Sequence, residues 1–306
     1  MSKYDDDKSL FLSPKVTQYD GHMVMTNVAK PTKTKYVSID TSYREEFSNY
    51  DSNALAVCNI SLPERVTEVT SIRVRNVEIP VAFYNISSVI GNNCFQIANG
   101  ANSSMAIIPD GQYTTTSLSS AVNAAIQSLS SPYTNLRYSI GSNNKSIFDV
   151  STGTLTINFA VNSNGSADSY NFKKKLGWLL GYRNIAYAIT TSPKPSEGIV
   201  NLSGIRYLYL VLDEFARGTP NSFIAALPSS LVRKTILAKI SVDQNNYPFG
   251  TVLIANHSNG YLLSDKRSYS GRVDLQKLCV QLVDDNGSPV SLNGLDFSFC
   301  LEVEHE

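Results

Sequence analysis

The sequence predicts a mainly β protein: a jelly-roll-like antiparallel β-sandwich with an inserted α+β module and an extended N-terminal arm. Short apolar segments alternate with turn residues along most of the chain, one stretch near the middle has helical spacing, and the first 35 residues are polar and interrupted by prolines. About a dozen short strands separated by turn residues are typical of a sandwich. We therefore expect residues 1–35 to form the arm and residues 36–306 to form the sandwich domain.

The arm is rich in Lys and Asp, a composition that cannot bury enough apolar surface to fold alone. It can be a disordered tail, or it can become ordered on a neighbouring subunit. Apolar side chains within it favour the second interpretation, because a purely solvated tail does not need them. The candidate contact residues of the arm are Phe11, Leu12, Met23, Val24 and Met25.

The sandwich domain is expected to begin with three strands. Residues 36–40 and 54–60 form two short apolar segments. Residues 66–79 alternate apolar and polar side chains with a period of two over part of their length, which is typical of a half-buried strand. The alternation changes phase near residues 75–76, so we expect a β-bulge there, and Pro80 is expected to end the strand.

Residues 104–190 are expected to form a β-α-β-β-α insert on the sandwich. Residues 116–129 place apolar side chains at helical spacing, which predicts an amphipathic helix. Strands are expected at 146–150 and 154–159, joined as a hairpin by a short connection that contains glycine. Residues 172–180 are expected to form a second short helix.

The last third of the chain returns to strands. They are expected at 206–212, 235–242, 274–283 and 297–303. The first of these is apolar on both faces, so both faces should be covered, either by the fold itself or by a partner. The DDNG sequence at 284–287 predicts a hairpin turn of the Asn-Gly type.

Composition excludes several functional classes. The chain holds 26 Lys and Arg and 26 Asp and Glu, so the formal net charge is zero, and no specific nucleic acid is expected as a partner. No apolar run approaches the roughly 18 residues of a transmembrane helix, and the first 30 residues lack the apolar core of a signal peptide. We therefore expect an intracellular protein with free cysteine thiols.

The search for catalytic or cofactor motifs is mostly negative. Three histidines are far apart, and no nucleotide-binding, zinc-protease or serine-hydrolase motif occurs. The adjacent carboxylates Asp213 and Glu214 are expected at a solvated strand end. An enzyme such as a glycoside hydrolase needs two carboxylates about 5–9.5 Å apart across a cleft, and the sequence pairs no two. We expect no enzymatic activity, no cofactor and no metal.

Four sets of motifs give the chain a resemblance to a known family. They are YVSIDTSYR at 36–44; IRVRNVEIPVAF at 72–83 with GNN at 91–93; IPDGQY at 108–113 with LGWLLGYR at 176–183; and SYSGRVDLQKL at 268–278 with DDNG at 284–287, LN at 292–293 and DFSF at 296–299. In order and spacing they resemble the minor capsid proteins of large nucleocytoplasmic DNA viruses. Thr41 stands where the family pattern has Ser.

The resemblance implies a structural protein of an icosahedral shell, assembled in the host cytoplasm and located in the virion. It would bridge and position capsomers, with the major capsid protein and other minor capsid proteins as partners and a second copy of itself as a further candidate. The motifs have the character of fold determinants, so the resemblance implies no catalytic residues. Besides the arm, the candidate contact residues are Lys173, Lys174 and Lys175, although three lysines that open a helix can also be a solvated face.

An alternative function is open. The 17 Tyr and 12 Phe residues suit a sheet core, but aromatic side chains also anchor interfaces. A carbohydrate- or receptor-binding jelly roll of the virion would use exposed tyrosines and Trp178 as stacking platforms. The position of Trp178 within LGWLLGYR instead favours a place in the core.

Overall fold

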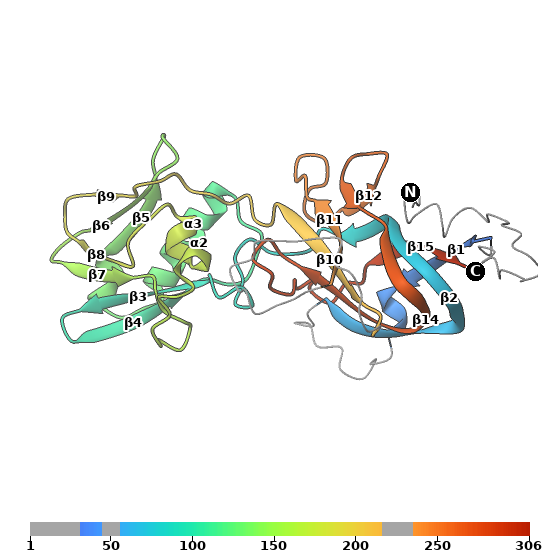
Figure 1. Cartoon of the computed structure of the whole chain (residues 1–306). Helices are drawn as coiled ribbons and strands as arrows, with labels where there is room; N and C mark the ends of the chain where they lie inside the picture. The colour runs from blue at the N-terminus through green and yellow to red at the C-terminus, as the bar shows by residue number, and fades with distance from the viewer. Residues whose placement is uncertain (1–30, 45–55, 216–234) are drawn as a thin grey trace, which may run out of the picture.

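The computed structural model describes residues 31–44, 56–215 and 235–306 of the chain. They form two lobes that lie end to end (Figure 1). The sandwich lobe contains both ends of the described chain, and the insert lobe is built from residues 84–204. The candidate contact residues of the arm lie outside the described residues: Phe11, Leu12, Met23, Val24 and Met25.

The sandwich lobe is one antiparallel eight-stranded sheet in the order β1-β15-β2-β14-β10-β11-β13, with β12 paired to β2. This confirms the mainly β, jelly-roll-like fold class. The strands are β1 (Lys33–Asp40), β2 (Val57–Pro80), β10 (Tyr207–Asp213), β11 (Ile236–Ser241), β12 (Val252–Asn256), β13 (Leu262–Ser264), β14 (Arg267–Val283) and β15 (Ser298–His305).

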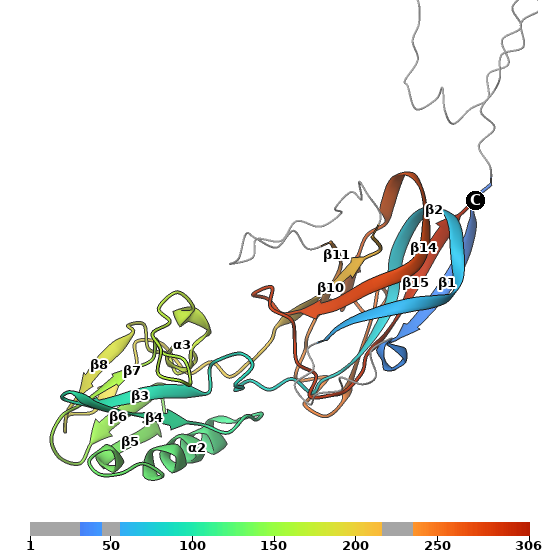
Figure 2. The same ribbon diagram turned by 90° about the horizontal axis from the view of Figure 1, so that it is seen from below.

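The sheet curls because two of its strands are long and bent (Figure 2). The first part of β2 pairs with the end of β14, whereas its last part pairs with β15 on one side and β12 on the other. The two strands predicted at 54–60 and 66–79 are therefore one 24-residue strand, β2. Its polar centre bends without ending the strand: Glu68 has a φ of +55°, and the pairing with β14 shifts register nearby.

Local predictions within the sandwich lobe are confirmed. Val74 pairs with Leu301 and Asn76 pairs with Cys300, which leaves Arg75 as the extra residue of the expected bulge. The 284–287 segment is a turn, closed by the Asp284 N–H bond to the Ser288 carbonyl (2.8 Å). On β15 and at the residue before it, the expected alternation places one set of side chains in the core: Phe297, Phe299, Leu301 and Val303.

Strand β10 is covered on both faces, as predicted. Leu208 and Leu210 are fully buried in the main core of the sandwich lobe. Tyr209 and Val211 point to the opposite face, where they are buried in a second, smaller apolar cluster. The alternation along this strand therefore separates two apolar environments.

The insert lobe has two small antiparallel sheets, β4-β3-β7-β8 and β5-β6-β9, packed with two helices. Its core extends from Ile86 to Leu202, beyond both ends of the expected insert at 104–190. Its elements are β3 (Cys94–Asn99), β4 (Asn102–Ile107), α2 (Thr115–Gln127), β5 (Leu136–Ile140), β6 (Ser146–Val150), β7 (Leu155–Asn158), α3 (Leu176–Leu179), β8 (Ala186–Ile189) and β9 (Lys194–Pro195).

Helix α2 confirms the predicted amphipathic helix. Thr114 caps its N-terminus in a capping box with Ser117, and Leu118, Val122 and Ile126 face the core. The hairpin predicted for the two following strands is wrong. Strand β6 pairs with β5 and β9, whereas β7 pairs with β3 and β8, so the glycine-containing connection passes from one sheet to the other. Alternation identifies a strand but not its partner.

Candidate interaction surfaces and the interlobe groove

The first and last resembling motifs lock together in the sandwich lobe. Thr41 Oγ1 donates to Asp296 Oδ1 (3.0 Å) and accepts from the Phe297 N–H (3.0 Å). The Arg44 guanidinium forms an ion pair with the same Asp296 carboxylate. These contacts join positions about 255 residues apart in the chain, and they fix the end of β1 against the start of β15, its neighbour in the sheet.

A second lock joins the motifs at 91–93 and 108–113. The Asp110 carboxylate accepts from Ser88 N–H (2.7 Å), Ser88 Oγ (2.6 Å), Ser87 Oγ (3.2 Å) and Asn93 Nδ2 (3.2 Å). With its oxygens committed to this loop, Asp110 has a structural role. The motif residues of both locks act as fold determinants and do not converge on an active site.

The prediction of a solvated strand end at Glu214 is wrong. Its carboxylate is 1% exposed and forms an ion pair with Arg267 (3.0 Å), which is itself fully buried. Arg267 also donates to the carbonyl oxygens of Leu212 (3.1 Å) and Thr235 (2.9 Å). Partial burial beside this pair raises the pKa of Tyr269, with the Glu214 carboxylate acting in the same direction. The pair fixes β10, β11 and β14 to one another.

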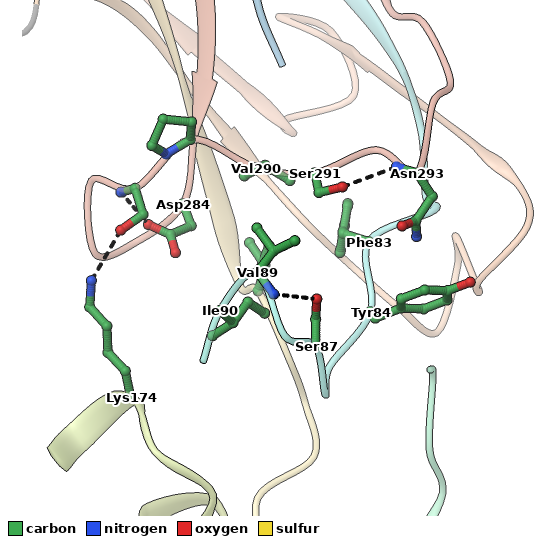
Figure 3. A pocket seen from close by; sticks show the side chains of 13 residues that line it. Phe83, Tyr84, Ser87, Val89, Ile90, Lys174, Asp284, Val290, Ser291 and Asn293 are labelled. Atoms are coloured by element: carbon green, nitrogen blue, oxygen red, sulfur yellow. Dashed lines mark hydrogen bonds between the residues drawn. The ribbon is translucent and has the colours of Figure 1, made fainter. Parts of the chain in front are cut away.

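The three candidate lysines have three different environments. Lys173 is exposed, whereas Lys174 reaches across to the sandwich lobe and donates to Ser288 Oγ (3.0 Å; Figure 3). Lys175 is 3% exposed and forms an ion pair with Asp168 (2.9 Å), whose pKa it lowers. Lys175 therefore stabilises the insert lobe, and its burial is incompatible with a partner contact. Contacts of Lys173 and Lys174 with a partner stay predictions.

Lys174 borders a small cavity of about 70 Å³ between the lobes. Phe83, Val89 and Ile90 form its apolar wall, and Asp284 lies on the opposite side (Figure 3). Burial raises the pKa of Asp284. Two N–H groups that donate to its Oδ1, and the nearby Lys174, act in the opposite direction and lower this pKa. Residues of both lobes line this cavity, which is too small for more than a few water molecules.

A larger groove of about 370 Å³ lies beside it, lined by residues of both lobes. We call it the interlobe groove. Trp178 lines it and is only half-buried, so its expected place in the core is wrong. Helix α3 has only four residues, and Leu176 and Gly177 occupy the core. The Arg183 guanidinium instead lies over the Trp178 ring, 4.2 Å from its centroid.

Sequence reasoning missed an exposed apolar surface on β12. Val252 and Ile254 are 51% and 45% exposed on the outer face of this strand, whereas Leu253 and Ala255 between them are fully buried. Nearby, Phe249 is also exposed and stacks on the ring of Tyr84 (5.7 Å between centroids). We call Phe249, Val252 and Ile254 the β12 patch. The alternation over TVLIAN was the signal that could have found it.

Within the described ranges, no cluster of His, Cys, Asp and Glu side chains is arranged to hold a metal ion. In the same residues, no helix combines the length and the apolar character needed to cross a membrane.

Comparison with known proteins does not identify a family for this chain. No protein-family model matches the chain, and no curated protein matches it by sequence. Among solved structures, the crystal structure of the selenomethionine-labelled mavirus penton protein is similar, with a TM-score of 0.42 and 9% sequence identity over 90% of this chain and 100% of that chain. A likeness of this degree carries no argument about function.

Proposed function

We propose that the protein is a structural component of a virus shell, a minor capsid protein that bridges and positions capsomers through protein–protein contacts. The observation that carries the proposal is the resemblance of residues 36–304 to minor capsid proteins. The resembling motifs also lie where a fold would need them: at the lock around Asp296, at the lock around Asp110 and along β14. A protein whose characteristic residues maintain shape fits a mechanical role.

The β12 patch supports contacts with other proteins. Exposed apolar side chains that gather on one surface are a feature of interaction sites. A formal net charge of zero leaves little long-range repulsion between copies or neighbours in a dense assembly. The proposed partners are the major capsid protein, other minor capsid proteins and a second copy of this chain, and the proposed location is the virion shell after assembly in the host cytoplasm.

The test is mass spectrometry of purified particles after stepwise extraction with detergent and salt, combined with chemical cross-linking. We expect the chain in the shell fraction, cross-linked to capsid neighbours. Recovery only from the cytosol of infected cells, never from particles, would refute the proposal. Deletion of residues 1–35 tests the arm separately, because unchanged incorporation would exclude a role for its apolar side chains.

A matched pair of variants tests the patch. Val252→Asp with Ile254→Asp places charge on the β12 patch, whereas Ile107→Asp places charge on a similarly exposed residue (51%) of β4 in the insert lobe. Incorporation into particles should fall for the first variant and persist for the second. Equal incorporation of both would exclude the β12 patch as a shell contact.

A further inference from the structure

The interlobe groove has the position and size of a ligand site. It lies between two lobes of one chain, a preferred location for binding sites, and its volume of about 370 Å³ falls within the usual range for small-molecule pockets. It receives side chains from the loop before β3, from α3, from the connection into β10 and from the turn after β14. Neither lobe forms it alone.

The groove is lined by hydrogen-bond donors and acceptors that have no partner among the described residues. Asn201 Oδ1 accepts from Ser203 N–H (3.1 Å) and Ser203 Oγ (2.6 Å), while its Nδ2 has no partner among the described residues. Asp284 uses Oδ1 to accept from the N–H groups of Asn286 and Ser288 (2.9 and 2.7 Å), and no hydrogen bond to Oδ2 is formed within the described ranges. The interlobe groove is therefore lined by a hydrogen-bond donor, Asn201 Nδ2, and an acceptor, Asp284 Oδ2, that have no partner among the described residues.

The charges of the groove alternate in sign. Lys173, Lys174 and Arg206 lie among the carboxylates of Asp284 and Asp285, and Arg206 lies 3.5 Å from Asp285. A phosphate would meet two carboxylates here, and a cation would meet three basic side chains. The lining therefore matches a neutral ligand that carries many hydroxyl groups, each of which can donate and accept.

Trp178 adds a half-buried aromatic ring to this polar lining. The Arg183 guanidinium and the Lys173 ammonium both lie over the ring (4.2 and 5.8 Å from its centroid), and Phe172 meets it edge-on (5.8 Å between centroids), so the ring orientation is fixed. An aromatic ring of fixed orientation can pack against the apolar C–H face of a sugar, and the amide and carboxylate groups beside it can bond to the sugar hydroxyls.

We propose that the interlobe groove binds a neutral oligosaccharide, with Trp178 against a sugar face and with Asn201 and Asp284 bonded to its hydroxyls. This inference goes beyond the shell role and does not depend on it. It also places sugar binding at the junction of the lobes and not on the tyrosines of the sandwich.

Trp178 is the single tryptophan of the chain, so its fluorescence reports directly on the groove. The full chain is titrated with neutral oligosaccharides (chitotriose, maltotriose, cellotetraose, N-acetyllactosamine, mannotriose) and with 3′-sialyllactose and heparin tetrasaccharide as acidic probes. We expect a neutral member to shift the emission. No response to any neutral sugar, or a response to the acidic probes alone, would overturn the proposal.

Variants are compared by isothermal titration calorimetry with the responding sugar. Trp178→Ala and Asn201→Ala should each weaken binding about tenfold. The control Tyr170→Ala removes an 85% exposed aromatic residue outside the groove and should bind as the natural chain does. Circular dichroism checks folding, and Asn201→Ala decides the case if Trp178→Ala does not fold. Unchanged binding by folded Asn201→Ala would refute the assignment.

Incorporation of Asn201→Ala into particles separates the two proposals. Loss of sugar binding with normal incorporation leaves both standing. A chain that never enters particles but binds the sugar removes only the shell role, and a chain that enters particles but binds no neutral sugar removes only the sugar site.

Discussion

Replacement of Arg267 by Met should destabilise the sandwich lobe more than any exposed ion pair could. The guanidinium is fully buried and pairs with Glu214 at 3.0 Å. It also satisfies carbonyl oxygens of β10 and of the segment that enters β11. Met has a similar length but no charge, so the substitution removes the guanidinium that pairs with the buried Glu214 carboxylate. Loss of one partner of a buried pair costs about 3–5 kcal/mol.

The assay is urea unfolding followed by two signals. Far-UV circular dichroism reports mainly on the sheets, whereas the emission of Trp178 reports on the insert lobe. Arg267→Met should shift the dichroism transition to lower urea and move the fluorescence transition less. Lys35→Met is the matched control, because Lys35 pairs with Glu64 at 2.9 Å but both side chains are well exposed, at 39% and 73%. It should cost less than about 1 kcal/mol.

A double substitution distinguishes the cost of losing the ion pair from the cost of leaving one charge buried. Glu214→Leu combined with Arg267→Met removes both charges and should recover part of the lost stability, because a buried pair can be replaced by apolar groups at little cost. If Arg267→Met unfolds within about 1 kcal/mol of the natural chain, or if the double variant is as unstable as the sum of the single ones, the reasoning from burial is wrong.

Three further predictions concern single positions. Gly181→Ala should lower the unfolding midpoint of the insert lobe, because the residue has a φ of +91° and an added Cβ would lie 2.3 Å from the Gly198 carbonyl oxygen; a cost of at least about 1 kcal/mol is expected in urea. Thr114→Ala removes the cap of α2 and should cost about 1 kcal/mol, whereas Thr114→Ser should cost little. Asp284→Asn should raise stability at neutral pH. Burial raises the pKa of Asp284, so the folded state holds its proton more tightly than the unfolded state. The charged form therefore destabilises the fold above this pKa, and the advantage of Asn should vanish below the ordinary pKa of Asp, about 3.9. Melting temperatures across pH 3–8 that stay equally separated would contradict this.

Features set by near neighbours in the chain were predictable from sequence. The inward set on β15, the bulge at Arg75 and the turn after Val283 follow from alternation and turn chemistry. Helix α2 follows from spacing. In each case the residues that determine the structure lie within a few positions of one another, so a short segment of sequence is enough to predict it.

Features set by distant partners were not predictable. Glu214 has the sequence context of a solvated strand end, but it is buried beside Arg267, which lies 53 residues away in the chain. Lys175 has the context of a solvated lysine run, but it meets Asp168 and Asn162 inside the insert lobe. A charged side chain is buried only where the tertiary structure brings a partner to it, and neither composition nor hydrophobic periodicity predicts that partner.

The interlobe groove is the extreme case of this dependence. Its lining comes from residues as far apart as Tyr84 and Asn286, which meet only because the insert leaves the sandwich after Phe83 and returns before Ile205. Lys174 donates a hydrogen bond to Ser288 across the junction, at the edge of the groove. This contact lies beside the polar atoms of Asn201 and Asp284 that form no hydrogen bond within the described part of the chain, and these atoms are the reason for proposing a ligand site at the junction.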